Sequence, residues 1–262
     1  MTRAMSGAAP ARAGAMTATA SVAESLAQVI LGEMAPGQSL PSEGDLAARF
    51  GVSRLTVREA IKMLAGRGLL DVGRGRRAIV IEPSGVAFSD FLFTLIQNDP
   101  KGLFDLIELR MSIEVQSAML AARRVSRAGL AALENAMQGM REATAQFNAG
   151  GEGASDALLR FHQYDVAFHE AVALSSGNRM ISYMFEAMAA PLRRSFNLSR
   201  RGHEERGGSL DDLLAAHVAV LDAIRSGDPK AAGAAMRTHL EETERDIQKV
   251  LNATTRDGPS TN

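Results

Sequence analysis

The sequence predicts a mainly α-helical protein, with an N-terminal winged helix-turn-helix and a C-terminal antiparallel bundle of about seven helices. Two short amphipathic helical patterns meet at Gly51, and a β-rich hairpin pattern whose tip carries arginines follows them. After residue 84 the hydrophobic pattern is helical throughout. We therefore expect domains at 21–83 and 84–252, between disordered tails at 1–20 and 253–262.

Composition favours a cytoplasmic protein of two domains. The chain has 262 residues, of which 46% are hydrophobic, and this suffices for two packed cores. It contains no cysteine, which excludes disulfides and thiolate metal sites and fits a reducing compartment. No apolar run approaches the roughly 18 residues that a membrane helix needs, so we expect no membrane partner.

Charge is concentrated in the N-terminal part of a nearly neutral chain. The formal net charge is −1, yet residues 49–77 carry eight basic and only two acidic residues. A local basic face fits a nucleic-acid-binding head, while an ordinary solvated surface remains the alternative if charge is considered alone. The spacing of the residues has to decide between the two.

Local signals place each element of the head. The pattern over 22–33 predicts an amphipathic helix, which Pro36 and Gly37 end. Ser42 is positioned to cap a helix over 43–50, and Asp45 completes a capping box. Gly51 supplies the left-handed residue that ends this helix, and Ser53 caps a second helix that runs to about residue 66.

The second helix and the hairpin carry the candidate DNA contacts. Arginines near a helix N-terminus suit phosphate and can also fork onto guanine. The runs 69–72 and 78–81 form a hairpin whose tip is positioned as a wing for the DNA backbone or minor groove. The candidate DNA-binding residues are Arg49, Ser53, Arg54, Thr56, Arg58, Arg74, Gly75, Arg76 and Arg77.

These motifs resemble the GntR-type transcription regulators. The matching residues are Pro36-Gly37, Leu40-Pro41-Ser42-Glu43, Asp45-Leu46-Ala47, Gly51-Val52-Ser53-Arg54, Thr56-Val57-Arg58-Glu59-Ala60, Leu64 and Gly68-Leu69. The resemblance implies that the partner is double-stranded DNA. Gly44 departs from the family pattern, which usually has a DNA-contacting arginine there. The wing also departs from the family pattern, because arginines fill positions 76 and 77.

The C-terminal region predicts seven helices, over 86–97, 102–124, 127–147, 153–174, 178–198, 209–226 and 229–252. Breaks rich in Gly, Asn, Asp, Ser and Pro separate them, including 98–100, 148–151 and 202–208. Asp228 before Pro229 is typical of a helix start. The core of such a bundle is a natural place for a ligand pocket.

Asp165, His169, His217 and His239 form a candidate divalent metal site. Asp165 and His169 are four residues apart and share a helix face, while His217 and His239 come from two further helices. Three imidazoles and a carboxylate suit such an ion, although each histidine alone is more often a core or surface residue. His162 and His203 are expected at the surface.

The same region resembles the effector domain of the FadR subfamily. The motifs are Leu106-Ile107-Glu108-Leu109-Arg110, Asp165-Val166-Ala167-Phe168-His169, Ser176-Gly177-Asn178, His217 with Leu221-Asp222-Ala223-Ile224, Gly227-Asp228 and Met236-Arg237-Thr238-His239-Leu240. The resemblance implies a metal held by the four residues above, with zinc first and nickel or manganese as alternatives. It also implies a small organic acid effector.

Two further residues are candidates for binding that effector. Arg110 lies in the helix whose family arginine meets the effector carboxylate, and an ion pair with a neighbouring glutamate is the alternative. Asn178 is either a pocket residue or a helix N-cap. Both are retained as candidate effector contacts.

The combined prediction is a homodimeric, metabolite-responsive transcription regulator, not an enzyme. Its two heads would read a palindromic operator, and repression released by the effector is the commoner mode in the family. A helical-bundle metalloenzyme acting on a small carboxylate is one alternative, for which the sequence shows no well-spaced glutamate base. A regulator whose metal is purely structural is the other.

Overall fold

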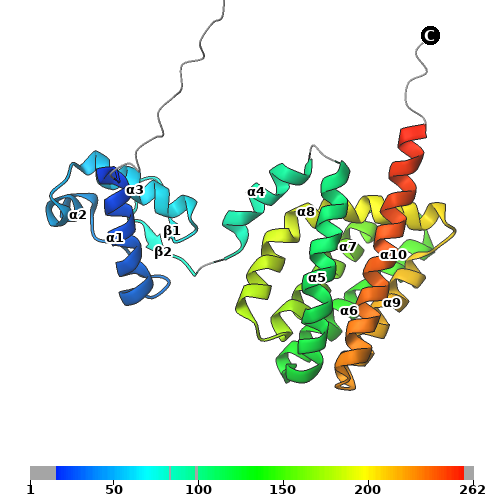
Figure 1. The fold of residues 1–262 in the computed structure, drawn as a ribbon. Helices are drawn as coiled ribbons and strands as arrows, with labels where there is room; N and C mark the ends of the chain where they lie inside the picture. Colours follow the sequence, from blue (N-terminus) through cyan, green and yellow to red (C-terminus); the bar gives the residue numbers. More distant parts are fainter. Residues whose placement is uncertain (1–15, 83, 98–99, 257–262) are drawn as a thin grey trace, which may run out of the picture. The chain divides into compact units, whose positions relative to one another are not determined.

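The computed structural model describes residues 16–82, 84–97 and 100–256. The chain divides into two compact units, Met1–Pro83 and Ser84–Asn262, and each is described by itself. The structure confirms the mainly α fold, with a winged helix-turn-helix in the first unit and a helical bundle in the second (Figure 1).

The first unit packs three helices on a small hairpin. Its elements are α1 (Ala18–Glu33), α2 (Glu43–Phe50), α3 (Arg54–Gly66), β1 (Leu70–Asp71) and β2 (Ile79–Val80). Buried residues from every element form one core, which includes Leu26, Leu46, Val57, Leu64 and Val80. Both strands are two residues long and pair antiparallel, so the wing strands are shorter than the sequence suggested.

Capping bonds fix the turn between α2 and α3. The Ser42 hydroxyl accepts a hydrogen bond from the Asp45 backbone N–H, and the Asp45 carboxylate accepts one from the Ser42 backbone N–H. Gly51 has φ of 67°, and its N–H donates to the Ala47 carbonyl. Ser53 caps α3 by accepting a hydrogen bond from the Thr56 N–H at 3.1 Å. The capping and the left-handed glycine are therefore confirmed.

The second unit contains seven helices among its described residues. They are α4 (Val86–Gln97), α5 (Pro100–Arg124), α6 (Arg127–Ala149), α7 (Ala154–Ser175), α8 (Arg179–Glu205), α9 (Leu210–Arg225) and α10 (Pro229–Arg256). Its main core joins α5, α6, α7, α9 and α10 through fully buried residues such as Leu133, Met137, Phe161 and Phe168. None of the described helices has the length and apolar character to cross a membrane.

The tail boundaries differ from those expected. Residues 18–20 begin α1, because the Thr17 hydroxyl accepts a hydrogen bond from the Ala20 N–H and caps the helix. Residues 253–256 continue α10, whose Val250 is still buried. The disordered tails expected at 1–20 and 253–262 are therefore wrong at 18–20 and 253–256, while 1–15 and 257–262 lie outside the described residues.

One predicted helix break is also wrong. The run 202–208 was expected as a loop, but α8 continues through Gly202 to Glu205. A Cβ on Gly202 would lie 1.9 Å from the backbone oxygen of Asp246, so this glycine allows α8 to approach α10 closely. The break expected at 98–99 lies outside the described residues, and α5 begins at Pro100.

Candidate functional site

A groove in the first unit gathers most of the candidate DNA contacts. It has a volume of about 930 Å³ and lies between the N-terminus of α2, the start of α3 and the wing. Its lining includes Arg54, Arg58 and the whole wing tip, with Arg74, Gly75, Arg76 and Arg77. An arginine-lined groove of this kind is suited to the phosphates and base edges of a nucleic acid.

Two arginines of the groove are held by carboxylates. Arg58 binds the Glu43 carboxylate side-on, with Nε 3.0 Å from Oε1 and Nη2 2.7 Å from Oε2. In the wing, Arg76 Nη2 lies 2.6 Å from Asp71 Oδ2. The Arg58 contact lowers the pKa of Glu43, chiefly through the hydrogen bond itself. Both arginines are therefore oriented before any DNA arrives.

Arg54 lies beside Gly44. Its guanidinium lies 3.4 to 3.6 Å from the point where a Cβ on Gly44 would stand. A Cβ at this position would therefore be in ordinary van der Waals contact with the guanidinium. At the position where the family usually has an arginine, this chain has a glycine that lies beside Arg54.

The remaining candidate contacts lie near the groove but do not line it. The Ser53 and Thr56 hydroxyls are 2.9 Å apart at the start of α3. Arg49 is exposed at the end of α2, with its guanidinium carbon 6.0 Å from the Phe50 ring centre. Leu55, which the sequence analysis passed over, is 64% exposed on the first turn of α3. An exposed apolar side chain there is suited to a thymine methyl group.

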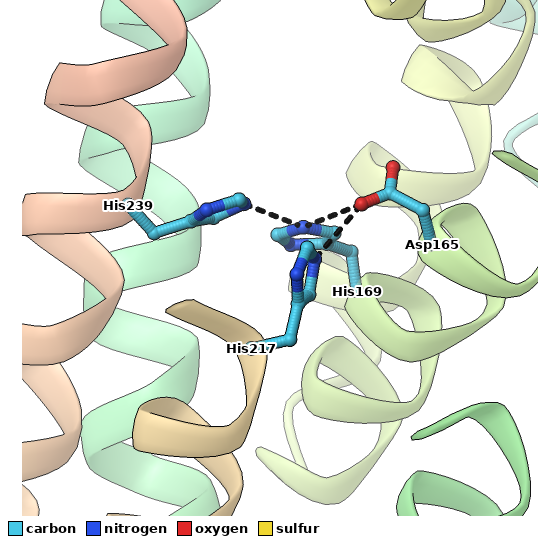
Figure 2. Close-up of side chains that lie close together, drawn as sticks. All are labelled: Asp165, His169, His217 and His239. Atoms are coloured by element: carbon cyan, nitrogen blue, oxygen red, sulfur yellow. Dashed lines mark hydrogen bonds and ion pairs between the residues drawn. The ribbon is translucent and has the colours of Figure 1, made fainter. Parts of the chain in front are cut away.

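The second unit brings the four predicted metal ligands together. Asp165 and His169 extend from α7, His217 from α9 and His239 from α10, and the four side chains converge (Figure 2). One ligand atom from each lies within 4.8 Å of the others, and the three histidines are buried. His217 Nε2 is 2.8 Å from Asp165 Oδ1, and His239 Nε2 is 3.3 Å from His169 Nε2.

Hydrogen bonding shows which histidine atoms face this centre. His217 Nδ1 is 2.8 Å from the Leu213 carbonyl, which can only accept, so this nitrogen carries the proton. The Nε2 on the other side of the His217 ring is therefore the nitrogen that faces an oxygen of Asp165. Burial lowers the pKa of His239 well below its usual value, so that imidazole is neutral. With Nδ1 of His217 held by the backbone, its Nε2 is the atom that a cation at this centre would bind.

A buried carboxylate supports this centre from behind. Glu114 of α5 is 1% exposed, with Oε2 2.5 Å from His169 Nδ1 and Oε1 2.6 Å from Arg110 Nε. Burial would raise the pKa of Glu114, but Arg110 and His169 outweigh it and lower the pKa to about 2. A carboxylate behind a ligating histidine fixes its tautomer and increases its basicity. The sequence analysis did not name Glu114, although its spacing of four from Arg110 places the two on one face of α5.

A small cavity adjoins the four ligands. Its volume is about 30 Å³, space for roughly two water molecules, since one needs about 10–15 Å³. Arg110 lines this cavity and also forms an ion pair with Glu114. The ion pair that the sequence analysis gave as the alternative role of Arg110 is therefore present together with its position at the cavity. The other polar lining residues, which the sequence analysis missed, are Ser195, Ser199, Arg200 and Thr243.

The structure also shows where two further residues of the sequence analysis, Asn178 and His203, lie. Asn178 caps α8 by accepting a hydrogen bond from the Met180 N–H at 3.0 Å, and it is not among the residues that line the cavity. His203 was expected in a surface loop, but it lies in α8 and is buried against Asp246, with Nδ1 3.4 Å from Oδ2. The surface prediction for His203 is wrong because the helix continues through Gly202.

Known proteins resemble the chain over both units. Residues 18–80 match the model of the bacterial regulatory proteins of the gntR family, and residues 105–242 match the FCD domain model. The Glc operon transcriptional activator of Escherichia coli strain K12 is 26% identical over 230 residues, which cover 87% of this chain and 88% of that protein. The repressor NanR of Citrobacter rodentium is 31% identical over 225 residues, which cover 84% and 81%.

A further relative and a solved structure agree with these matches. The galactonate operon transcriptional repressor of Escherichia coli strain K12 is 28% identical, with 85% of this chain and 93% of that protein covered. The solved structure of Streptococcus agalactiae GntR superposes with a TM-score of 0.69 at 30% identity, and it covers 87% of this chain and 99% of that one.

Proposed function

The chain belongs to the GntR family of DNA-binding transcription regulators and carries an FCD effector domain, and we propose that it is a metal-dependent, acid-responsive member of the FadR subfamily. In this proposal two copies form a homodimer and read a palindromic operator with their heads. A small organic acid binds the helical unit and changes the affinity for the operator. The proposal rests on the four potential ligand atoms that converge at Asp165, His169, His217 and His239.

The donor set suits a divalent ion, with zinc first and nickel or manganese as alternatives. Three neutral imidazole nitrogens and one carboxylate oxygen would hold it, with Glu114 orienting His169. When bound, such an ion supplies a Lewis acid to which an effector carboxylate can bind. Arg110 at the cavity wall adds a cationic donor for the same carboxylate.

The chain's own residues determine which acid fits. The cavity of about 30 Å³ admits a few heavy atoms, so a compact acid is favoured over a bulky one. The hydroxyls of Ser195, Ser199 and Thr243 are suited to hydrogen bonds with the rest of the effector. Effector binding and DNA binding are linked, so each changes the affinity for the other by the same factor.

Repression is the proposed output, released when the acid binds. The relatives include proteins named as repressors and proteins named as activators. A reporter gene behind a bound operator tests the sign. Expression that rises when this chain is deleted supports repression, and expression that falls contradicts it.

The DNA assignment is tested by an Arg58→Ala variant in a gel-shift assay. The probe is a duplex that the wild-type chain selects from a randomised library. We expect affinity to fall at least about fivefold, because one arginine–guanine pair contributes about 1–3 kcal/mol. Arg67→Ala removes another exposed arginine, outside the groove, and serves as the control. Equal affinities of the Arg58 and Arg67 variants would refute the assignment.

The metal assignment is tested by metal content and zinc-dependent stability. Zinc at about a hundred times its Kd should stabilise the wild-type chain by about 2.7 kcal/mol. His217→Ala should abolish this gain, whereas His162→Gln, on the same helix as two ligands, should keep it. A zinc response that survives in His217→Ala would overturn the assignment.

The effector assignment needs a separate readout. A panel of short hydroxy, keto and dicarboxylic acids is titrated into the zinc-loaded chain, while its affinity for the selected duplex is followed. At least one acid should change that affinity, and zinc removal should abolish the change. Zinc-dependent stability without any response to the acids would mark the metal as purely structural.

A further inference from the structure

Glu43 is an acidic residue that directly contacts Arg58, one of the candidate DNA contacts of α3. It is the first residue of α2, and its carboxylate faces Arg58 across the turn. Oε2 lies 2.7 Å from Arg58 Nη2 and Oε1 lies 3.0 Å from Arg58 Nε. Both side chains line the groove between α3 and the wing. The pair therefore stands where DNA is expected to bind.

Folding stability does not account for this pair. The Arg58 side chain is 54% exposed and that of Glu43 is 35% exposed. Exposed ion pairs contribute little to folding, because water screens them and ordering two long side chains costs entropy. A carboxylate among DNA-binding cations also repels phosphate. Its position in the groove therefore needs a reason other than stability.

The geometry of the pair supplies that reason. An arginine has five N–H donors, and Glu43 occupies the one on Nε and one on Nη2. The two N–H groups on Nη1 and the second N–H group on Nη2 are directed away from Glu43 and form a free fork of donors. A fork of this kind pairs with O6 and N7 of guanine. Because Glu43 holds the guanidinium, Arg58 loses less conformational entropy when it binds a base.

The negative charge of Glu43 should also increase the preference for specific DNA. Glu43 also lies within electrostatic reach of Arg54 and Lys62, both of which lower its pKa in addition to Arg58. Its negative charge weakens any contact that depends on phosphate attraction alone. Non-specific DNA is bound by that attraction, whereas a specific site also gains from the oriented fork. Both effects increase the difference between specific and non-specific binding.

We propose that Glu43 is a positioning residue for sequence recognition, which orients the free fork of Arg58 toward a base and weakens binding to DNA of other sequences. The inference rests on DNA binding by the head but not on the metal or the effector. It assigns the base contact to Arg58 and the selectivity of that contact to Glu43.

The test compares full-length Glu43→Gln with the wild-type chain on two duplexes. One duplex is selected by the wild-type chain from a randomised library, and the other is a scrambled version of it. Glutamine removes the charge of Glu43 but has nearly the same size, so the start of α2 should not be disturbed. We expect scrambled DNA to be bound more tightly and the ratio of the two affinities to fall about tenfold.

Two matched variants separate positioning from charge. Glu59→Gln removes the same charge from a neighbouring residue, which pairs with Lys62 and not with a groove arginine. It should strengthen binding to both duplexes by the same factor and leave their ratio unchanged. In an Arg58→Ala background, Glu43→Gln should no longer change the ratio, because the fork it orients is gone.

The outcomes are distinct. An unchanged ratio in Glu43→Gln, or the same change in Glu59→Gln, would overturn the positioning role. A change that persists in the Arg58→Ala background would also overturn it. A wild-type chain that selects no duplex would instead refute the DNA assignment. Thermal melting of each variant identifies any that fails to fold. Glu43→Asp then replaces Glu43→Gln: it keeps the charge but is too short to hold Arg58 side-on, so the ratio of affinities should still fall while binding to scrambled DNA stays unchanged.

Discussion

Replacing Glu114 by glutamine should destabilise the metal-free chain by about 3 kcal/mol at neutral pH. The pKa of Glu114 is lowered from 4.5 to about 2, which is the net result of burial, which raises it, and of Arg110 and His169, which lower it. At about 1.4 kcal/mol for each pKa unit, this corresponds to roughly 3 kcal/mol. The loss of one partner from a buried ion pair typically costs a similar amount, about 3–5 kcal/mol.

The difference in folding stability between wild type and Glu114→Gln should change with pH in one direction. The pKa of Glu114 is depressed in the folded state, so its contribution is complete above the unfolded pKa of 4.5. It is lost progressively as the pH falls toward about 2. Between about pH 7 and about pH 4, the gap between wild type and Glu114→Gln should therefore shrink by roughly 1 kcal/mol.

Urea denaturation in the presence of a chelator measures this gap at both pH values. Glu108→Gln, on an exposed position of the same helix, is the control and should change the free energy of unfolding by less than about 0.5 kcal/mol. A loss below about 1 kcal/mol in Glu114→Gln would refute the reasoning. So would a gap between the variants that widens as the pH falls.

Three further predictions concern the metal, a helix contact and a turn. Glu114→Gln should weaken zinc binding by about 10- to 100-fold in a competition assay with a chelating dye; an affinity within twofold of wild type would exclude the supporting role. Gly202→Ala should cost at least about 2 kcal/mol in urea denaturation, because its Cβ would meet the Asp246 backbone oxygen at 1.9 Å. Gly32→Ala, where nothing lies within 4 Å of the added Cβ, should cost nothing, and equal losses in both would contradict the packing argument. Gly51→Ala should cost about 1–2 kcal/mol through its φ of 67° alone; thermal melting that shows no loss would mean that the turn relaxes.

Local signals in the sequence were enough for most of the head. Ser42, Gly51 and Ser53 act within three or four residues of themselves, so caps and turn could be predicted from spacing. The four metal candidates were predicted by residue type, helical spacing and family resemblance, and the structure brings them together. Resemblance was needed for that set, because three separate helices supply its members.

Tertiary packing determines what the sequence analysis missed. Gly202 reads as a helix breaker, and only its approach to α10 shows that it serves packing instead. The burial of His203 follows from that error. Glu43 and Arg58 are 15 residues apart, so their pairing depends on the angle between α2 and α3. The role of Glu114 likewise depends on a histidine of another helix.

The space above Gly44 limits how this head can be redesigned. Because the Arg54 guanidinium lies 3.4 to 3.6 Å from a Cβ placed there, a side chain introduced at position 44 would touch it, and an arginine would add a second positive charge beside it. The conformation of Arg54 would then depend on the residue at position 44. Positions 44 and 54 form a coupled pair, and a library that alters operator preference should vary them together.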